Sequence, residues 1–418
     1  MFLAASLLPA QKRMAVRAGK LLDVRTGQLL EDRVVLIENG DIAAVTPFTQ
    51  YKPEPNVPLL DLGRNKTLLP GLIDSHVHIT FASNSAPTAW LLTSAPRAAL
   101  IGARNARTLL EAGFTTIRNV GGSQFSDISL RDAIEAGDVA GPRILTAANS
   151  ICITGGHCDS SAVLPPEMKA EGQGAADGPV NMEHKVREQI KYGADLIKIT
   201  ATGGVMSART DPRFPHMTLE EIQAVVKTAH GLGRKVASHA HAAEGVKRSV
   251  QAGVDSIEHG HMMDDEAIAM MKAKGTYLVP TVYLCEYNLA NMASSPMPEF
   301  NKRKMKLVCD VGVDNVRKAI QAGVKIAFGT DTPVFPHGLN AREFAAYVRL
   351  GMTPLAAIRS ATLHAADLLG TSDKMGAIEP GKYADLVAVD GNPLENIRLL
   401  EDVKFVMKGG AVIRRAAD

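Results

Sequence analysis

Cysteine is scarce in this chain, and neither charged nor apolar residues accumulate in long runs. The four cysteines are too few and too scattered for a disulfide framework or a cysteine-based zinc site, although Cys152 and Cys158 could pair. No basic run suggests a nucleic-acid partner, and the formal net charge of +2 implies no polyanion partner. No apolar run reaches the roughly 18 residues that suggest a membrane span. The other two cysteines are Cys285 and Cys309.

The N-terminal residues leave the cellular location open. Residues 2–9 are apolar and are followed by Gln11, Lys12 and Arg13, but the basic segment that begins a secretory signal is missing. The segment could be the remainder of a trimmed signal or the frayed start of the chain. Cytoplasmic, periplasmic and secreted locations are therefore all compatible with it.

The two ends of the chain share a β-rich pattern. Residues 14–66 contain short β-rich runs with a hairpin signal at residues 38–41, and residues 376–415 have the same character. We expect these ends to pair in one small domain, a β-sandwich formed by both termini. The 418 residues are enough for this domain and for one large domain over residues 67–375.

Strand and helix patterns alternate between these two ends. Apolar runs predict eight strands, and the segments between them have the apolar spacing of helices, several of which end at glycine. Such a series predicts an α/β fold, a (β/α)8 TIM barrel. An open doubly wound sheet is the alternative, but no Gly-x-Gly-x-x-Gly opens a helix after the first strand. The predicted strands are residues 72–76, 115–119, 143–147, 196–200, 236–239, 256–259, 277–281 and 325–329.

Two long connections follow the third and fourth predicted strands. Residues 150–179 are rich in Gly, Pro, Ser and Ala, and residues 202–216 contain a Gly-Gly pair. Long loops without periodicity are usually functional or disordered. Because the loops that follow the strands build the active site of a barrel, we predict that these two loops gate the substrate.

Two histidines one residue apart end the first predicted strand. Residues i and i+2 of a strand point to the same side, so His76 and His78 can direct both imidazoles to one point, as a metal site needs. Other residues suited to metal binding lie at or near the ends of other predicted strands, and a barrel brings these ends around one axis. These further candidates are Lys198, His239, His259 and Asp331.

Lys198 and Asp331 each allow two interpretations. Lys198 could extend its ammonium to water, or burial could lower its pKa and keep the neutral amine populated. A neutral amine can add carbon dioxide to form a carbamate, which could bridge two divalent metals about 3.5–4 Å apart. Asp331 could cap the helix that follows it or act as a general base in a hydrolytic metal site, and we favour the catalytic role.

Together these motifs resemble the amidohydrolase superfamily. The branch that the chain resembles contains binuclear amidases and Xaa-Pro dipeptidases related to imidazolonepropionase, and it includes ochratoxin-hydrolysing amidases. The resemblance spans nearly the whole chain. The matching segments are residues 70–78 (PGLIDSHVH), 115–122 (TTIRNVGG), 155–157 (GGH), 198–205 (KITATGGV), 238–241 (SHAH), 257–260 (IEHG), 329–331 (GTD) and 376–387 (GAIEPGKYADLV).

The resemblance implies amide hydrolysis at a centre of two divalent metals, usually zinc. A hydroxide that bridges the metals would attack the amide carbonyl, and Asp331 would relay the proton to the leaving nitrogen. Lys198 would carry the carbamate derived from carbon dioxide, as N6-carboxylysine. Many relatives are octamers, which implies a homo-oligomer. The implied ligands are His76, His78, Lys198 and Asp331 for one metal, and Lys198, His239 and His259 for the other.

The substrates implied by the resemblance are N-acyl or N-aminoacyl L-amino acids, including proline dipeptides. Ochratoxin A belongs to this class and would give ochratoxin alpha and phenylalanine. A substrate with a free carboxylate needs cationic or hydroxyl partners near the metals. The candidates for this role are His157, His241, Tyr283 and Arg209.

Two features point away from this branch. Asn119 stands where the family pattern has aspartate, and His241 with Glu244 forms a His-x-x-Glu pattern that resembles mononuclear deaminases. In those enzymes the glutamate handles protons, and Lys198 would be structural. The alternative function is therefore a mononuclear deaminase or an imidazolonepropionase-like hydrolase of a cyclic C–N bond. A non-catalytic barrel is a third hypothesis, against which the complete set of candidate ligands argues.

Overall fold

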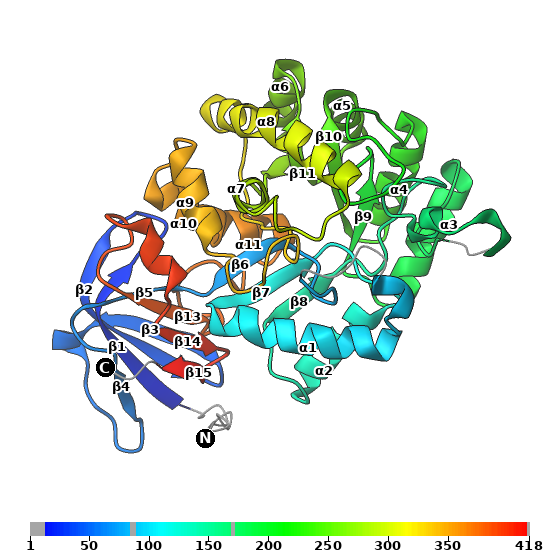
Figure 1. Ribbon diagram of the computed structural model, residues 1–418. Helices are drawn as coiled ribbons and strands as arrows, with labels where there is room; N and C mark the ends of the chain where they lie inside the picture. Colours follow the sequence, from blue (N-terminus) through cyan, green and yellow to red (C-terminus); the bar gives the residue numbers. More distant parts are fainter. Residues whose placement is uncertain (1–12, 84–88, 169–171, 416–418) are drawn as a thin grey trace.

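Strands from both ends of the chain lie side by side in one mixed sheet, drawn in blue and red in Figure 1. The computed structural model describes residues 13–83, 89–168 and 172–415, so the apolar segment at residues 2–9 lies outside the described residues. The strand order is β15-β14-β13-β5-β1-β2-β3, and β4 pairs with β1. The strands are β1 (Arg13–Leu22), β2 (Leu29–Glu38), β3 (Asp41–Pro47), β4 (Leu59–Asp61), β5 (Lys66–Pro70), β13 (Leu386–Asp390), β14 (Phe405–Lys408) and β15 (Ala411–Arg415).

The terminal strands form one hydrogen-bonded sheet, whereas the sequence predicted a sandwich. β5 pairs in parallel with β1 and antiparallel with β13, so it joins the N-terminal strands to the C-terminal ones. The predicted hairpin between β2 and β3 is confirmed, because Asn39 and Gly40 have positive φ angles of 51° and 88°. The sheet has its own apolar core, which includes Val16, Ile37, Leu68, Leu386 and Phe405.

Two smaller sheets contain the parallel strands of the middle of the chain, in the orders β6-β7-β8 and β12-β11-β10-β9. Seven of the eight predicted strands are present. The strands are β6 (Leu72–Val77), β7 (Phe114–Asn119), β8 (Arg143–Thr146), β9 (Leu196–Thr200), β10 (Lys235–Ala242), β11 (Ser256–Met262) and β12 (Tyr277–Val279).

The eighth predicted strand, residues 325–329, forms an isolated bridge with Leu278 instead of a strand. Its neighbour β12 is three residues long and offers few partners. The segment nevertheless bonds to both sides, because Leu278 N donates to Lys325 O (2.8 Å) and Ser75 N donates to Phe328 O (2.7 Å). It therefore lies between β12 and β6.

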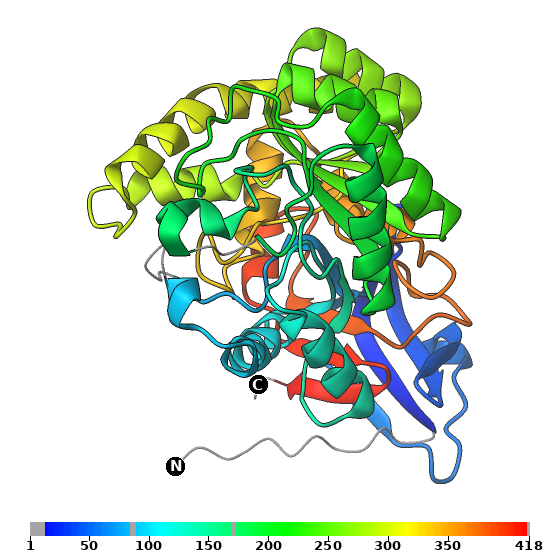
Figure 2. The same ribbon diagram turned by 90° about the vertical axis from the view of Figure 1, so that its right-hand side faces the viewer.

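Helices follow most of these strands and lie on their outer side (Figures 1 and 2). Thr218 and Glu221 form a capping box at the start of α4, and Gly253 and Gly323 end α5 and α8 in the left-handed conformation. The helices are α1 (Ala95–Glu111), α2 (Ser126–Ala136), α3 (Pro179–Lys191), α4 (Leu219–Gly231), α5 (Ala243–Ala252), α6 (Asp265–Lys274), α7 (Tyr283–Ala290), α8 (Glu299–Ala322), α9 (Arg342–Arg349), α10 (Pro354–Ser360) and α11 (Leu363–Leu369). Short 3-10 helices are η1 (Phe48–Gln50), η2 (Ala89–Leu92), η3 (Ser160–Val163), η4 (Pro166–Met168) and η5 (Ile397–Glu401).

The cysteines form two disulfides, so the prediction that they are too scattered for a disulfide framework was wrong. Cys152 and Cys158, the pair that the sequence allowed, close a short loop after β8. Cys285 and Cys309 join α7 to α8. The second bond was missed because its partners, 24 residues apart, become neighbours only when the two helices pack.

The two long connections follow the carboxyl ends of β8 and β9. Within its described residues, the first contains only the short helices η3 and η4, and residues 201–218 contain no helix or strand. Both loops therefore begin at the carboxyl ends of the parallel strands. His78 lies at the same end, directly after β6. None of the helices that the structure describes is long and apolar enough to cross a membrane.

Candidate metal centre

The first group of candidate ligands lies where β6 meets the segment after residue 329. His76 is in β6 and His78 follows it directly, and both Nε2 atoms lie 3.3 Å from Oδ1 of Asp331. Asp331 has a positive φ of 62°, and its backbone N–H donates to the His76 carbonyl at 2.7 Å. Left-handed backbone at a residue other than glycine is strained and is frequent at functional sites. These three residues could hold one metal ion.

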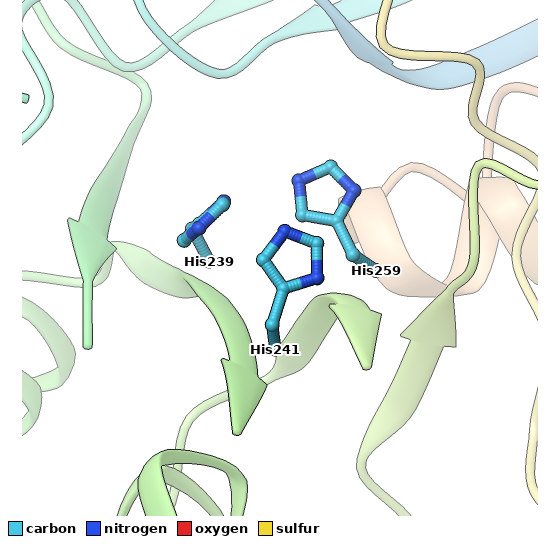
Figure 3. A group of neighbouring side chains, drawn as sticks. All are labelled: His239, His241 and His259. Atoms are coloured by element: carbon cyan, nitrogen blue, oxygen red, sulfur yellow. The ribbon is translucent and has the colours of Figure 1, made fainter. Parts of the chain in front are cut away.

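The second group consists of three buried histidines from two neighbouring strands (Figure 3). His239 and His241 lie on the same side of β10, and His259 lies on β11. The ring centroids are 4.8–5.0 Å apart. The His259 ring is also 4.9 Å from the His76 ring, so the two groups adjoin and form one centre.

His241 belongs to the second group, although the sequence suggested a role in substrate binding. Its Nδ1 atom is buried and has no hydrogen-bond partner in the described part of the chain. The signal was available in the sequence, because His239-x-His241 at the end of β10 repeats the His76-x-His78 pattern at the end of β6. The structure therefore brings together three histidines where the sequence predicted two.

Hydrogen bonds fix how three of the imidazoles face the centre. The Nδ1 atom of His76 bonds to Glu258 Oε2 at 2.7 Å, that of His78 to the Gly121 carbonyl at 2.9 Å, and that of His259 to Thr281 Oγ1 at 2.7 Å. When the outer nitrogen of a histidine is held in this way, the other nitrogen is oriented toward a metal. The arrangement fits the demands of a metal site.

Glu258 is the functional residue that the sequence analysis missed. Its carboxylate is fully buried between His76 and Arg118, which donates from Nη2 to Oε1 at 2.7 Å. Burial alone would raise the pKa of Glu258, but the Arg118 charge, the His76 hydrogen bond and the Lys198 charge hold that pKa well below its usual range. Glu258 is therefore ionised and can orient the His76 ring.

Lys198 is 2% exposed and lies on β9 between two buried isoleucines. Burial lowers its pKa to about 8, although the nearby Glu258 charge opposes this shift. The imidazoles of the second histidine group also have pKa values well below the usual range, because they are buried, because other imidazoles are close and because the Lys198 charge is close. The neutral amine of Lys198 is therefore more populated at neutral pH than that of an ordinary lysine.

Buried polar side chains support the segment that carries Asp331. Asp74 accepts hydrogen bonds from Thr330 Oγ1 (2.7 Å), Asn340 Nδ2 (2.8 Å) and the His76 backbone N–H (3.1 Å). Burial raises the pKa of Asp74 to about 7 despite these donors. Burial would also raise the pKa of Asp331, but the His76 and His78 imidazoles hold it well below its usual range. Asp331 is therefore ionised at neutral pH.

Asn119, which departs from the family pattern, supports the backbone beside His78. Its amide oxygen accepts a hydrogen bond from the Ile79 N–H at 2.7 Å. Its amide nitrogen donates to Asp127 Oδ2 at 2.9 Å and to Thr146 Oγ1 at 3.1 Å. The substitution therefore leaves the two groups of candidate ligands intact.

The remaining predicted substrate-binding residues lie in different surroundings. The His157 ring stacks on the His239 ring with centroids 4.4 Å apart, so it borders the centre. Tyr283 is buried at the start of α7, and its hydroxyl accepts a hydrogen bond from Arg342 Nη1 at 2.9 Å. Arg209 is exposed on the loop after β9. The structure thus brings His157 to the centre and leaves Arg209 at the surface.

Glu244, the proton carrier of the deaminase alternative, lies at the surface in α5. Its side chain is 51% exposed, and Oε1 accepts a hydrogen bond from Arg248 Nε at 2.8 Å, one helical turn further along α5. An exposed i,i+4 ion pair is the ordinary surface role of such a residue.

A largely buried centre with two histidine-rich candidate metal sites, built at the ends of parallel strands, defines a metal-dependent hydrolase. The chain belongs to the amidohydrolase family, whose family model matches residues 67–413. This agrees with the resemblance inferred from the sequence motifs.

Individual relatives agree with this assignment. The chain is 34% identical over 373 residues to ochratoxinase of Aspergillus niger, with 84% of this chain and 76% of the relative covered. It is 41% identical to a Xaa-Pro dipeptidase solved with bound methionine, with a TM-score of 0.90 and coverage of 96% and 99%. It is 33% identical to a prolidase complexed with N-methylphosphonate-L-proline, with a TM-score of 0.88 and coverage of 96% and 100%. The protein is a metal-dependent amidohydrolase related to ochratoxinase and prolidases.

We predict that Glu258→Gln weakens metal binding. The variant loses the charge that orients the His76 ring and leaves Arg118 without its anionic partner. Loss of such an outer partner typically weakens metal affinity about 10–100-fold. Titration of the metal-free protein in competition with a chelator measures the change.

The matched control for this experiment is Glu244→Gln. It also neutralises a glutamate, but one in an exposed pair with Arg248, so metal affinity and activity should stay at the wild-type level. Equal metal affinities for the Glu258→Gln and wild-type proteins would contradict the orienting role, and loss of activity in Glu244→Gln would favour the deaminase alternative.

Proposed function

We propose that this amidohydrolase cleaves the amide bond of N-acyl or N-aminoacyl L-amino acids, in the manner of a carboxypeptidase or dipeptidase. The observation that carries the proposal is the meeting of two groups of candidate ligands around one centre. One group is His76, His78 and Asp331, and the other contains His239 and His259. A binuclear hydrolytic centre needs such a double set of ligands.

We further propose that the parallel strands close into a (β/α)8 TIM barrel over residues 67–375, with residues 14–66 and 376–415 as a small β domain. Two bridges support the closure: Ile151 pairs with Ile199 beside β9, and Val77 pairs with Thr332 beside β6. A closed barrel accounts for the convergence of strand ends at the centre. Assembly into a homo-oligomer stays a prediction from the family resemblance.

The donor set fits two divalent ions, and histidine nitrogens with carboxylate oxygens suit zinc. When bound, the metals would activate water and polarise the amide carbonyl. The Lys198 side chain, as a carbamate derived from carbon dioxide, would contribute to both sites. His241 is available either as a further ligand or as a substrate contact, since its Nδ1 has no hydrogen-bond partner among the described residues. The proposed ligands are His76, His78, Lys198 and Asp331 for one ion, and Lys198, His239 and His259 for the other.

Three residues of the chain would have separate roles in the reaction. Asp331, ionised at neutral pH, would accept the proton of the attacking water and transfer it to the leaving nitrogen. Glu258 would keep the His76 ring oriented throughout, because its own hydrogen bonds involve no substrate. His157 stacks on His239 at the border of the centre and, among the candidates outside the two ligand groups, is the best placed to contact the substrate.

The relatives together with the site support the proposed substrate class. Ochratoxinase and the Xaa-Pro dipeptidase are similar to this chain over most of its length. The name of the first implies action on ochratoxin and that of the second implies cleavage of an amide bond to proline, and we propose that both substrates have a leaving group with a free carboxylate. Ochratoxin A and Xaa-Pro dipeptides are therefore the first substrates to test. The deaminase alternative is not favoured, because the Glu244 side chain forms its ion pair at the surface.

The first prediction for this function concerns recognition of the substrate carboxylate. Conversion of that carboxylate to its primary amide should lower kcat/KM by about 100-fold, which is the scale of one lost charge-assisted hydrogen bond. Steady-state kinetics on matched acid and amide pairs measure this ratio. Equal rates on the two forms would remove carboxylate recognition from the proposal.

Asp331→Asn should bind substrate and lose most of its turnover. The amide keeps the shape of the side chain but cannot accept the proton, and loss of a general base costs about 100-fold or more. The measurement is kcat of the metal-replete variant, with metal content determined in parallel because Asp331 is also a proposed ligand. Near wild-type kcat at full metal content would assign the base to another residue.

Lys198→Ala should lose metal as well as activity, because one side chain is proposed to serve both ions. Lys198→Arg should fail in the same way, since a guanidinium stays protonated and cannot form a carbamate. Metal analysis of the purified variants gives the result without a substrate, and a small carboxylic acid added to Lys198→Ala should restore part of the activity. An active enzyme with one metal and an unmodified Lys198 would overturn the binuclear mechanism.

A further inference from the structure

Lys304, on α8, extends its ammonium into the long loop after β9. Its Nζ donates to three backbone carbonyls, those of Gly204 (2.8 Å), Ser207 (2.5 Å) and Thr210 (3.0 Å). An ammonium has three donors and no acceptor, so these three contacts satisfy it completely. One side chain thereby joins three points of the loop.

A second residue of α8 holds the same loop from the same side. Asn301 precedes Lys304 by one helical turn, so both side chains project from one face of the helix. Its buried amide nitrogen donates to the Val205 carbonyl. The loop backbone over residues 204–210 is therefore fixed to α8 by side chains from two positions.

The loop in turn holds His157. Ser207 Oγ bonds to Nδ1 of His157 at 2.8 Å, and the same Ser207 hydroxyl is hydrogen-bonded to Thr210. The imidazole also lies directly against Gly204, where a Cβ would come within 2.3 Å of its Cε1 atom. Any shift of residues 204–210 would therefore move the His157 ring or remove its support.

His157 connects this assembly to the candidate metal centre. Its ring stacks on His239, with 28° between the ring planes. The Cys152–Cys158 disulfide closes the short segment that carries His157 and limits the freedom of this segment. Because Nδ1 is bonded to Ser207, Nε2 is the ring nitrogen left for a ligand.

We propose that Lys304 is a positioning residue that acts through the loop at residues 204–210 to hold His157 in place for the substrate. Lys304 itself has no donor left for the substrate, since the loop carbonyls accept all three of its hydrogen bonds. The inference rests on the proposed role of His157 in substrate binding. It adds a residue of α8, more than 140 positions away from His157 in the chain, to the determinants of substrate affinity.

The test compares Lys304→Met with Lys306→Met on the same helix. Methionine keeps the length of the aliphatic chain and removes the three donors. Lys306 is the matched control, because its side chain is 63% exposed and forms an ion pair with Asp310, one turn further along the helix surface. Hydrogen–deuterium exchange of the amides in residues 202–216 should accelerate about 10-fold or more in Lys304→Met, and stay unchanged in Lys306→Met. Metal content should stay at the wild-type level in both.

Kinetics on a hydrolysed substrate then separate positioning from a general loss of structure. Lys304→Met should raise KM by about 10-fold with a much smaller change in kcat, and should add little to His157→Ala in the double variant. Unchanged exchange in the loop, or effects of Lys304→Met and His157→Ala that simply add, would overturn the inference. If the wild-type protein hydrolyses no amide of the proposed class, the proposed function fails, while the exchange experiment still decides whether Lys304 holds the loop.

Discussion

The hydrogen bonds of one buried carboxylate, Glu258, join strands of both central sheets. Glu258 lies on β11 and binds His76 on β6 and Arg118 on β7. Arg118 also donates to the Ser75 carbonyl of β6 and to Ser256 Oγ of β11. A buried charge is costly unless its partners are complete, and here both carboxylate oxygens are bonded. The position of the His76 imidazole, whose ring lies 4.9 Å from that of His259 where the two ligand groups adjoin, depends on this set of contacts.

The centre combines parts of different rigidity. The candidate ligands lie on or next to buried strands, where neighbouring strands and outer hydrogen bonds fix their direction. His157 lies on a loop that the Cys152–Cys158 disulfide closes, and its ring is bonded to Ser207, in the segment that the α8 side chains contact. Loops are the parts of this fold that vary most easily between relatives. A fixed centre with a loop held from a distant helix allows substrate choice to change without disturbing the ligands.

The sequence predicted those parts of the centre that depend on local pattern. His76 and His78 could be paired from strand alternation alone, and the same rule could have grouped His241 with His239. Glu258 could not be assigned in this way, because its role comes from Arg118 and His76, which lie on strands far away in the chain. The second disulfide, the single terminal sheet and the missing eighth strand likewise depend on how distant segments pack, which no local spacing encodes.

The balance of charge in the centre gives the strongest physical reason for a modified lysine. Four charged side chains lie in or next to it: the carboxylates of Glu258 and Asp331 and the cations Arg118 and Lys198. They cancel, and burial keeps the histidines of the second group neutral. Two divalent ions would add positive charge that these four side chains do not offset, and a nearby ammonium would raise the cost. We infer that Lys198 is the group that changes sign, because it is the only one of these four whose ordinary chemistry converts a cation into an anion.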